Sequence, residues 1–300
     1  MCKWFTPIMV KAGRDVNAFL FYQYQVELRL RAIRFAIGVV IAILYTFGPY
    51  SDFFVEASAI FSKPDWVIPS LGMLFPVLRW MTVAFSLLFC VGACQRIAAI
   101  ALTVTFGVTN LFVSQFAPHP WSANSHLNLF VFLFCFRGSH PIHEDVSKTA
   151  PNDVYGSFII AFMQCYIALF YFQSGFAKVY HVGFEWFLSG QTVLVSAHKF
   201  GTTFGRYLTK YPELFAIGAV ATGIIEFTIP VLLFVPRYRL YTAVLAFGLH
   251  LGIYLVLGIP FWHLWALFPF IYTKSVPVWF DNLRNRVALV IDRLWASQTR

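Results

Sequence analysis

Charged residues are scarce in this sequence. Asp, Glu, Lys and Arg make up 12% of its 300 residues, whereas about a quarter of a typical soluble domain is charged. Hydrophobic residues make up 59%, and the runs 35–51 and 97–136 contain no Asp, Glu, Lys or Arg. Runs of this length suit the apolar core of a bilayer. The composition therefore excludes an ordinary soluble domain and predicts an integral, multi-pass membrane protein with the lipid bilayer as its partner.

Acidic residues and cysteine pairs are also few. The chain has 13 acidic and 22 basic residues, which gives a formal net charge of +9. In a membrane protein such an excess marks the cytoplasmic face, so we predict no nucleic-acid partner.

The five cysteines form no Cys-x-x-Cys pair, which argues against a zinc ribbon or a thioredoxin-like redox site. We predict no metal site.

Breaker residues divide the apolar sequence into an all-α transmembrane bundle of about eight spans. Segments that combine proline with polar residues, such as 62–70, 117–125 and 138–153, separate the apolar runs. The expected spans are roughly 33–50, 72–92, 97–117, 124–137, 155–180, 214–235, 240–258 and 261–273. We expect this transmembrane domain, 33–273, to lie between a cytoplasmic N-terminal segment, 1–32, and a basic cytoplasmic tail, 274–300.

Lysine and arginine set the expected orientation of the bundle. If the N-terminus is inside, the inside segments carry 16 basic residues and the outside loops carry four. This positive-inside bias predicts that both termini are cytoplasmic. We expect the longest outside segment, 181–213, to contain a short interfacial helix.

Polar and ionisable residues within the expected spans are candidates for function, because such residues are costly in a bilayer and are retained mainly for a purpose. With the orientation above, most of them fall in the outer half of the membrane or near its midplane. They are Arg79, Asn110, His126, Asn128, Lys178, Glu226, His250 and His263.

Lys178 ends a helix face of small and polar residues. Gln164, Ala168, Tyr171, Gly175 and Lys178 follow steps of four, three, four and three, which places them on one side of a helix. Small residues on such a face indicate contact with another helix or with a ligand rather than with lipid. Two interpretations of the lysine stay open: a side chain that snorkels to the outer interface, or a desolvated amine that acts as a base.

Glu226 and the histidines also allow more than one interpretation. Glu226 is either a structural partner for Arg79 or a histidine, or a member of a proton relay, and Pro230 frees a backbone carbonyl beside it. His250 is an interhelical hydrogen-bond partner, a group that exchanges protons with a lysine, or a ligand of a metal or haem. His126 is either an interfacial polar residue or part of a site.

Four segments, in order, carry a family resemblance. They are "LRAIRFAIGVVIA" (30–42), "WSANSHLNLFVFLFCF" (121–136), "YFQSGFAKVYHVGFEWFLSGQ" (171–191) and "LAFGLHLGIYLVLGIPFWHLW" (245–265). Together they resemble the membrane domain of vitamin K-dependent gamma-carboxylases and their bacterial relatives, grouped as HTTM-domain proteins. The ordered set covers most of residues 25–273.

The resemblance implies chemistry that depends on a reduced isoprenoid quinone, either menaquinol or vitamin K hydroquinone. In this family a lysine takes a proton from the hydroquinone, oxygen adds, and the quinone becomes an epoxide. The strong base so formed abstracts a glutamate gamma proton, and carbon dioxide traps the carbanion. By its place in the motif Lys178 would be the first base, and His126 and His250 would position or polarise the ring. We expect the substrate or quinone pocket to include Tyr171, Gly175, Glu226, Asn128, Arg79 and His263.

The chain departs from the full carboxylases, which carry a large lumenal portion that binds a propeptide. Here about 27 residues follow the last expected span, and they are predicted to be cytoplasmic. The expected substrate is therefore a secreted peptide or a small molecule, modified at the outer face of a bacterial plasma membrane.

Two rival functions stay open. One is a non-enzymatic accessory or maturation protein for a secreted peptide, like the small SdpB-like relatives. The other is a proton-coupled transporter, against which the lack of an internal repeat counts.

Overall fold

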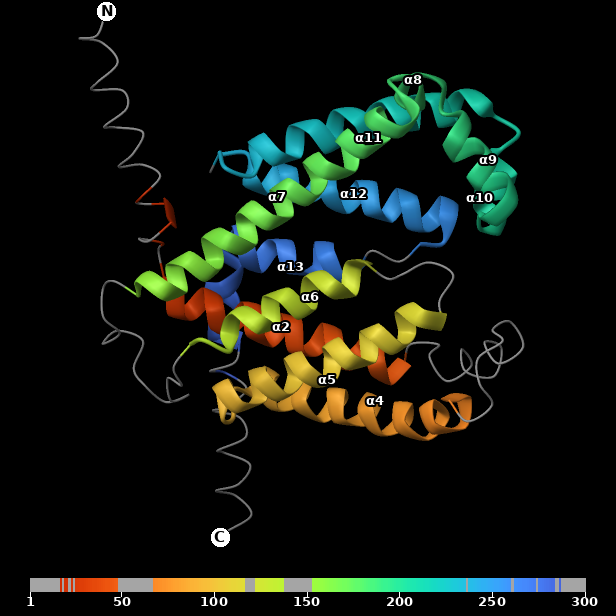
Figure 1. Cartoon of the computed structure of the whole chain (residues 1–300). Coiled ribbons are helices and arrows are strands. Elements are labelled where there is room, and N and C mark those ends of the chain that lie inside the picture. The colour runs from red at the N-terminus through yellow and green to blue at the C-terminus, as the bar shows by residue number, and fades with distance from the viewer. Residues whose placement is uncertain are drawn as a thin grey trace, which may run out of the picture. The chain divides into compact units, whose positions relative to one another are not determined.

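In the computed structural model of the chain, every regular element among the described residues is a helix (Figure 1). The structure describes residues 17, 19–20, 23, 25–47, 67–116, 122–137, 153–235, 237–259, 262–273, 275–283 and 286, without the side chains of 67–73, 112–116, 122–124 and 262–266. The chain divides into two compact units. Unit 1 is Met1–Ile159 with Pro277–Arg300, and unit 2 is Ile160–Val276.

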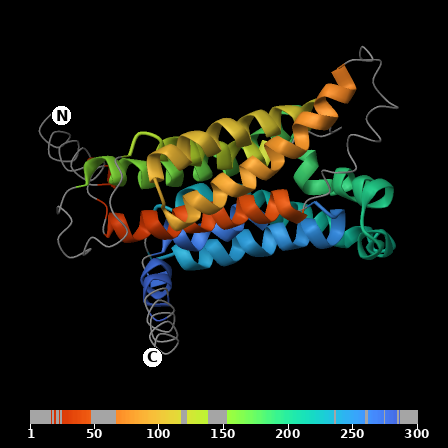
Figure 2. The same cartoon turned by 90° about the horizontal axis from the view of Figure 1, so that it is seen from below.

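Unit 1 is built from consecutive helices that pack against one another. They are α2 (Val26–Phe47), α4 (Val67–Val91), α5 (Gln95–Phe116), α6 (Ser122–Phe134) and the first turns of α7 (Val154–Val182). Helix α2 packs on α4, α4 on α5, and α5 on α6 (Figures 1 and 2). Gly92 ends α4 in the left-handed region, at φ +85°, where glycine is favoured.

Helices α2 and α4 approach each other closely at Gly38. A Cβ atom built on Gly38 would lie 2.7 Å from the Cβ of Cys90 and 2.7 Å from the carbonyl oxygen of Ser86. The flanking Ile37 and Ile41 are fully buried. Because lipid tails are as apolar as these side chains, close packing of small residues is what holds such helices together.

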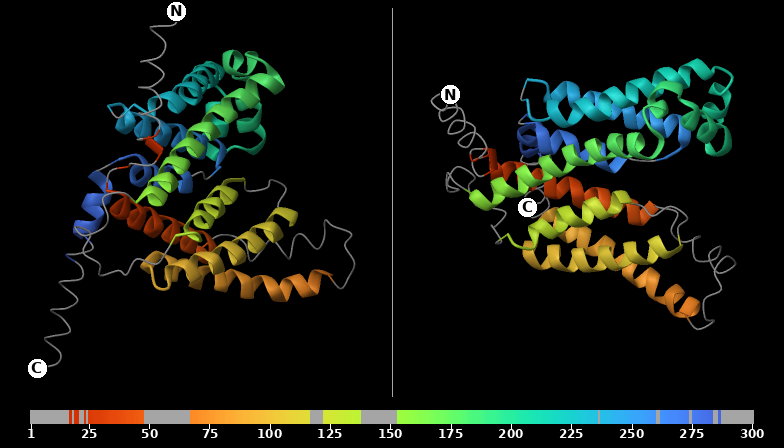
Figure 3. Two further views of the ribbon diagram at one scale, coloured as in Figure 1. Left: turned by 60° about the vertical axis from the view of Figure 1, so that its left-hand side comes forward. Right: turned by 45° about the horizontal axis from the view of Figure 1, so that its top comes forward.

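Unit 2 contains the rest of α7, which crosses the boundary between the units as one 29-residue helix. Its other long helices are α11 (Pro212–Leu232), α12 (Arg239–Leu257) and the shorter α13 (Trp262–Tyr272). Helix α12 packs on both α11 and α13. The short helices α8 (Glu185–Ser189), α9 (Gln191–Phe200) and α10 (Thr203–Leu208) gather at one end of α11 and α12 (Figure 3). The sequence predicts one short helix in 181–213, and the structure has three.

Among the described residues, five helices are long and apolar enough to cross a membrane, namely Val26–Phe47, Leu74–Val91, Val154–Val182, Pro212–Leu232 and Arg239–Leu257. They support a multi-pass helical membrane protein, and each coincides with an expected span. The three other expected spans coincide with α5, α6 and α13. Helix α2 begins at Val26, before the expected start of the first span at residue 33, and the charged residues of its first turns are buried.

Gly38 offers a test of the packing between α2 and α4. The substitution Gly38→Ala is expected to destabilise the protein by about 1–3 kcal/mol, because its methyl group overlaps α4. The matched control is Gly218→Ala in α11, where a Cβ meets no atom within 4 Å and alanine favours the helix. Denaturation of the two purified variants in micelles, followed by circular dichroism, measures the difference. Equal stability of the two variants would contradict this account.

Candidate functional site

An ion pair joins α7 to α11 in unit 2. Lys178 Nζ pairs with Glu226 Oε1 and donates a hydrogen bond to Ser174 Oγ at 3.0 Å. Ser174 Oγ in turn donates to Glu226 Oε1 at 2.9 Å. The Lys178 side chain is 22% exposed and the Glu226 side chain 6%. Ser174 and Lys178 are one helical turn apart, so both reach the same carboxylate.

Gly175 permits the close approach of α11 on which this ion pair depends. A Cβ atom on Gly175 would lie 3.2 Å from the ring of Phe227 and 3.3 Å from the Cβ of Glu226. A side chain at position 175 would therefore push α11 away from Ser174 and Lys178. The close approach of α11 therefore explains why the sequence has a small residue one turn before the lysine.

Aromatic residues cover the ion pair from the side of α8. The ring centroid of Trp186 lies 5.0 Å from Lys178 Nζ, within range of a cation–π interaction. The neighbouring Phe187 is buried against α11, where Gly223 leaves room for its ring. The short helix α8 thus places an aromatic ring against the ammonium group.

The same face of α7 also contacts α12 and α13. The hydroxyl of Tyr171 and Nε2 of His250 are 2.6 Å apart, and both side chains are buried. Two further hydrogen bonds connect α7 with α13: Gln164 Nε2 donates to the Ile271 carbonyl at 2.9 Å, and Tyr272 Oη donates to the Gln164 carbonyl at 2.7 Å. The prediction that this face contacts other helices is confirmed.

These contacts decide between several interpretations of the sequence. Lys178 does not simply snorkel, because its ammonium group is held by a carboxylate within unit 2. The expectation that Arg79 or a histidine is the structural partner of Glu226 is wrong, because the partner is Lys178. The interhelical role of His250 is confirmed by its contact with Tyr171.

One oxygen of Glu226 has no partner among the described residues. Oε2 is buried and accepts no hydrogen bond there, whereas Oε1 accepts two. A buried carboxylate oxygen without a donor is unfavourable by about 1–3 kcal/mol or more. Glu226 can therefore accept a hydrogen bond from the hydroxyl group of a ligand.

An apolar cavity of about 310 Å³ lies between α11 and α12, with contributions from α9 and α10. Its lining includes Ile225 and Leu249, the chain neighbours of Glu226 and His250. Three glycines also line it, Gly218, Gly248 and Gly252, and a Cβ atom on any of them meets nothing within 4 Å. The cavity can thus take an apolar chain between α11 and α12.

Three predicted site residues, Arg79, His126 and Asn128, belong to unit 1. Arg79 donates from Nε to the carbonyl of Tyr45 at 2.5 Å and from Nη2 to that of Thr46 at 2.9 Å. It therefore caps the C-terminal end of α2, a structural task. His126 is buried in α6, and Nδ2 of Asn128 faces Gly107 of α5.

The structure thus brings together five predicted residues in unit 2, namely Tyr171, Gly175, Lys178, Glu226 and His250. The side chain of His263 lies outside the described residues, although the residue belongs to α13. Sequence reasoning missed Ser174 and Trp186 as parts of the site. The spacing of Ser174 four residues before Lys178 is a signal that could have identified it. In the part of the chain that the structure describes, no three His, Cys, Asp or Glu residues are placed to hold a metal ion.

Comparisons of the chain with family models, with curated proteins and with solved structures give no match.

The ion pair can be tested by a double-mutant cycle. Lys178→Met leaves a buried carboxylate without its cation, so we expect a loss of about 2–4 kcal/mol in unfolding free energy. The double variant Lys178→Met with Glu226→Gln should be less destabilised than the sum of the single variants. The control Lys199→Met removes an exposed lysine and should change little. Additive losses in chemical denaturation would show that the pair is not coupled.

Proposed function

We propose that the chain is an HTTM-type membrane enzyme that takes a proton from a reduced isoprenoid quinone with Lys178 and Glu226. The proposal includes about eight spans, cytoplasmic termini and a site on the outer face of a bacterial plasma membrane. The observation that carries it is the partly buried Lys178–Glu226 pair, held by Ser174 and covered by Trp186. A lysine fixed in this way is suited to act as a base rather than as an anchor.

Proton movement within the pair prepares the base. In the ion pair Lys178 carries the proton and has no lone pair to accept another. Transfer of that proton from Nζ to Glu226 Oε1 gives a neutral amine and a neutral carboxylic acid. The amine then accepts a hydroxyl proton from the ligand and becomes an ammonium again. A reduced quinone, when bound, would supply that hydroxyl proton, and its two electrons would pass to oxygen.

The residues present fit such a ligand in two respects. The unpartnered Glu226 Oε2 can accept a hydrogen bond from a hydroxyl group. The apolar cavity between α11 and α12 suits an isoprenoid chain, because its lining is mostly apolar. Tyr171 and His250 hold each other in position and fix α12 relative to α7. The substrate modified in the second half of the reaction is proposed to be a secreted peptide or a small molecule.

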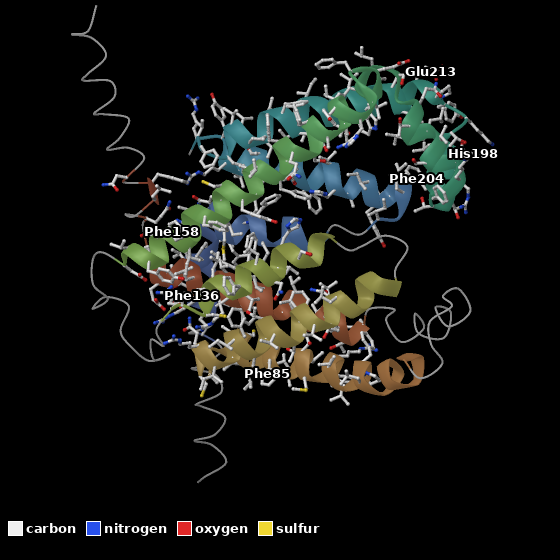
Figure 4. The ribbon with its side chains drawn as sticks, viewed as in Figure 1. Phe85, Phe136, Phe158, His198, Phe204 and Glu213 are labelled. Atoms are coloured by element: carbon white, nitrogen blue, oxygen red, sulfur yellow. The ribbon has the colours of Figure 1, made fainter. Side chains whose placement is uncertain are left out.

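A specific observation favours a second candidate, the accessory or maturation protein. Helices α8 to α10 expose large apolar side chains, including Leu188 at 69%, Phe200 at 80% and Phe204 at 52% (Figure 4). Such side chains can bind a hydrophobic peptide. In that case Lys178→Ala is silent, whereas replacing Phe200 and Phe204 by serine abolishes maturation of the peptide.

Quinol turnover tests the main proposal. In lipid nanodiscs with menaquinol or vitamin K hydroquinone, oxygen and candidate peptides, we expect the chain to oxidise the quinol. Lys178→Ala should lower the rate by at least about 100-fold, the usual contribution of a general base. Lys199→Ala, an exposed lysine, should keep the wild-type rate. If the wild-type chain forms no oxidised quinone or quinone epoxide, and Lys178→Ala behaves identically, the proposal is wrong.

The cavity gives an independent test of where the apolar chain binds. Gly252→Leu fills the cavity without meeting another atom at its Cβ, so we expect normal folding and a KM for quinol raised by about tenfold or more, since several methylene contacts are lost. The control Val244→Leu lies on an exposed part of α12 and should leave KM unchanged. An unchanged KM in Gly252→Leu would exclude the cavity as the quinol site.

A further inference from the structure

A row of exposed aromatic residues lies on α10 and on the turn that follows it in unit 2. Phe204, Tyr207 and Tyr211 each expose about half of their surface. Phe204 and Tyr207 are one turn apart on α10, and the ring centroids of Tyr207 and Tyr211 are 6.2 Å apart. Exposed aromatic side chains that gather in this way mark an interaction surface. We call these three residues the aromatic row.

Two basic residues accompany the aromatic row. Arg206 belongs to α10 and Lys210 to the turn before α11, and both are exposed. Lys210 Nζ lies 5.1 Å from the ring centroid of Tyr207, so a cation–π interaction holds the ammonium group beside the row. Neither Arg206 nor Lys210 forms an ion pair with a carboxylate among the described residues, and 191–211 contains no Asp or Glu. The surface is therefore both aromatic and positively charged.

Helix α10 is fixed at the ends of α11 and α12 (Figure 1). The backbone N–H of Thr202 donates to the carbonyl of Val256 at 3.1 Å, and the hydroxyl of Thr202 donates to the carbonyl of Leu255 at 2.5 Å. Gly205 lets α10 lie against the same last turn of α12, because a Cβ atom there would be 2.0 Å from the Val256 oxygen. Helix α11 begins directly after the aromatic row ends.

This attachment locates α10 relative to a bilayer. Helices α11 and α12 are each long and apolar enough to cross one, so the start of α11 and the end of α12 belong at a membrane–water interface. Aromatic residues are enriched at that level, and lysine and arginine beside them extend toward the head groups. Head groups that complement two cations without carboxylate partners are negatively charged.

We propose that α10 and the turn after it bind anionic phospholipids, with Arg206 and Lys210 at the phosphates and the aromatic row among the upper parts of the acyl chains. The proposal is independent of quinol chemistry, because it uses none of the residues of the Lys178–Glu226 site and requires no turnover. Leu208 of the same helix lines the apolar cavity, so the lipid contact also holds one wall of that cavity in place.

Hydrogen exchange in nanodiscs tests this surface. The full chain is placed in phosphatidylcholine with increasing phosphatidylglycerol, and exchange of the backbone amides of 203–211 is followed by mass spectrometry. We expect phosphatidylglycerol to slow this exchange, because a lipid that binds the folded segment makes its local opening rarer. Lys210→Gln should require about fivefold more phosphatidylglycerol for the same protection, as expected for the loss of one basic residue near anionic head groups.

Two matched variants control for charge and for side-chain identity. Arg237→Gln removes an exposed arginine from the turn at the other end of α11 and α12, and it should respond like the wild type. An equal loss in Arg237→Gln would reduce the effect to overall charge and overturn the proposal. Lys210→Arg keeps the charge and should keep the response, so a lost response there would also overturn it.

Two outcomes in the wild-type chain are decisive as well. If phosphatidylglycerol leaves the exchange of 203–211 unchanged, the segment does not bind anionic lipid and the proposal is wrong. A hydrophobic peptide is added in parallel to nanodiscs of phosphatidylcholine alone. If the peptide slows the exchange as strongly as phosphatidylglycerol does, the surface binds peptide rather than lipid, which overturns the proposal.

Discussion

A charged side chain inside a helical membrane protein must find a partner on a neighbouring helix, and this constraint organises unit 2. Lys178 on α7 and Glu226 on α11 satisfy each other, and Ser174 joins the two. The pair forms only because Gly175 lets α11 come close. One turn further along the same face, Tyr171 reaches His250 on α12. Polar contacts along one face of α7 therefore determine which helices lie next to it. Apolar contacts cannot do this, because lipid tails are as apolar as the side chains of the helices.

The same constraint acts in unit 1 with different chemistry. Arg79 is satisfied by backbone carbonyls at the end of α2. Glu27 is shared by Arg31 and Arg137, so the first turn of α2 is tied to the segment after α6. These contacts explain how the charged start of α2 is buried rather than exposed to water. In both units the helix ends and the few internal charges determine which helices meet.

The sequence predicted the helical class, the position of most long helices and the contact face of α7, because each follows from local periodicity. It did not predict that Lys178 pairs with Glu226, since spacing along α7 identifies a face but not the helix that covers it. The burial of Glu27 and Arg31 was missed for a related reason, because charges near a chain end are typical of a solvated segment. The three helices α8 to α10 are too short to give a clear periodic signal. The sequence thus allowed inference of local features, such as helices and their faces. It did not allow inference of which residues far apart in the chain form contacts.

The neutrality of the Lys178–Glu226 pair as a whole has an electrical consequence. A membrane potential acts in opposite directions on the ammonium of Lys178 and the carboxylate of Glu226, which are in hydrogen-bond contact. One charge moved fully across 100 mV corresponds to about 2.3 kcal/mol, but the contributions of two opposite charges at nearly the same depth of the roughly 30 Å apolar core largely cancel. Depolarising the cell is therefore expected to place little net force on the pair.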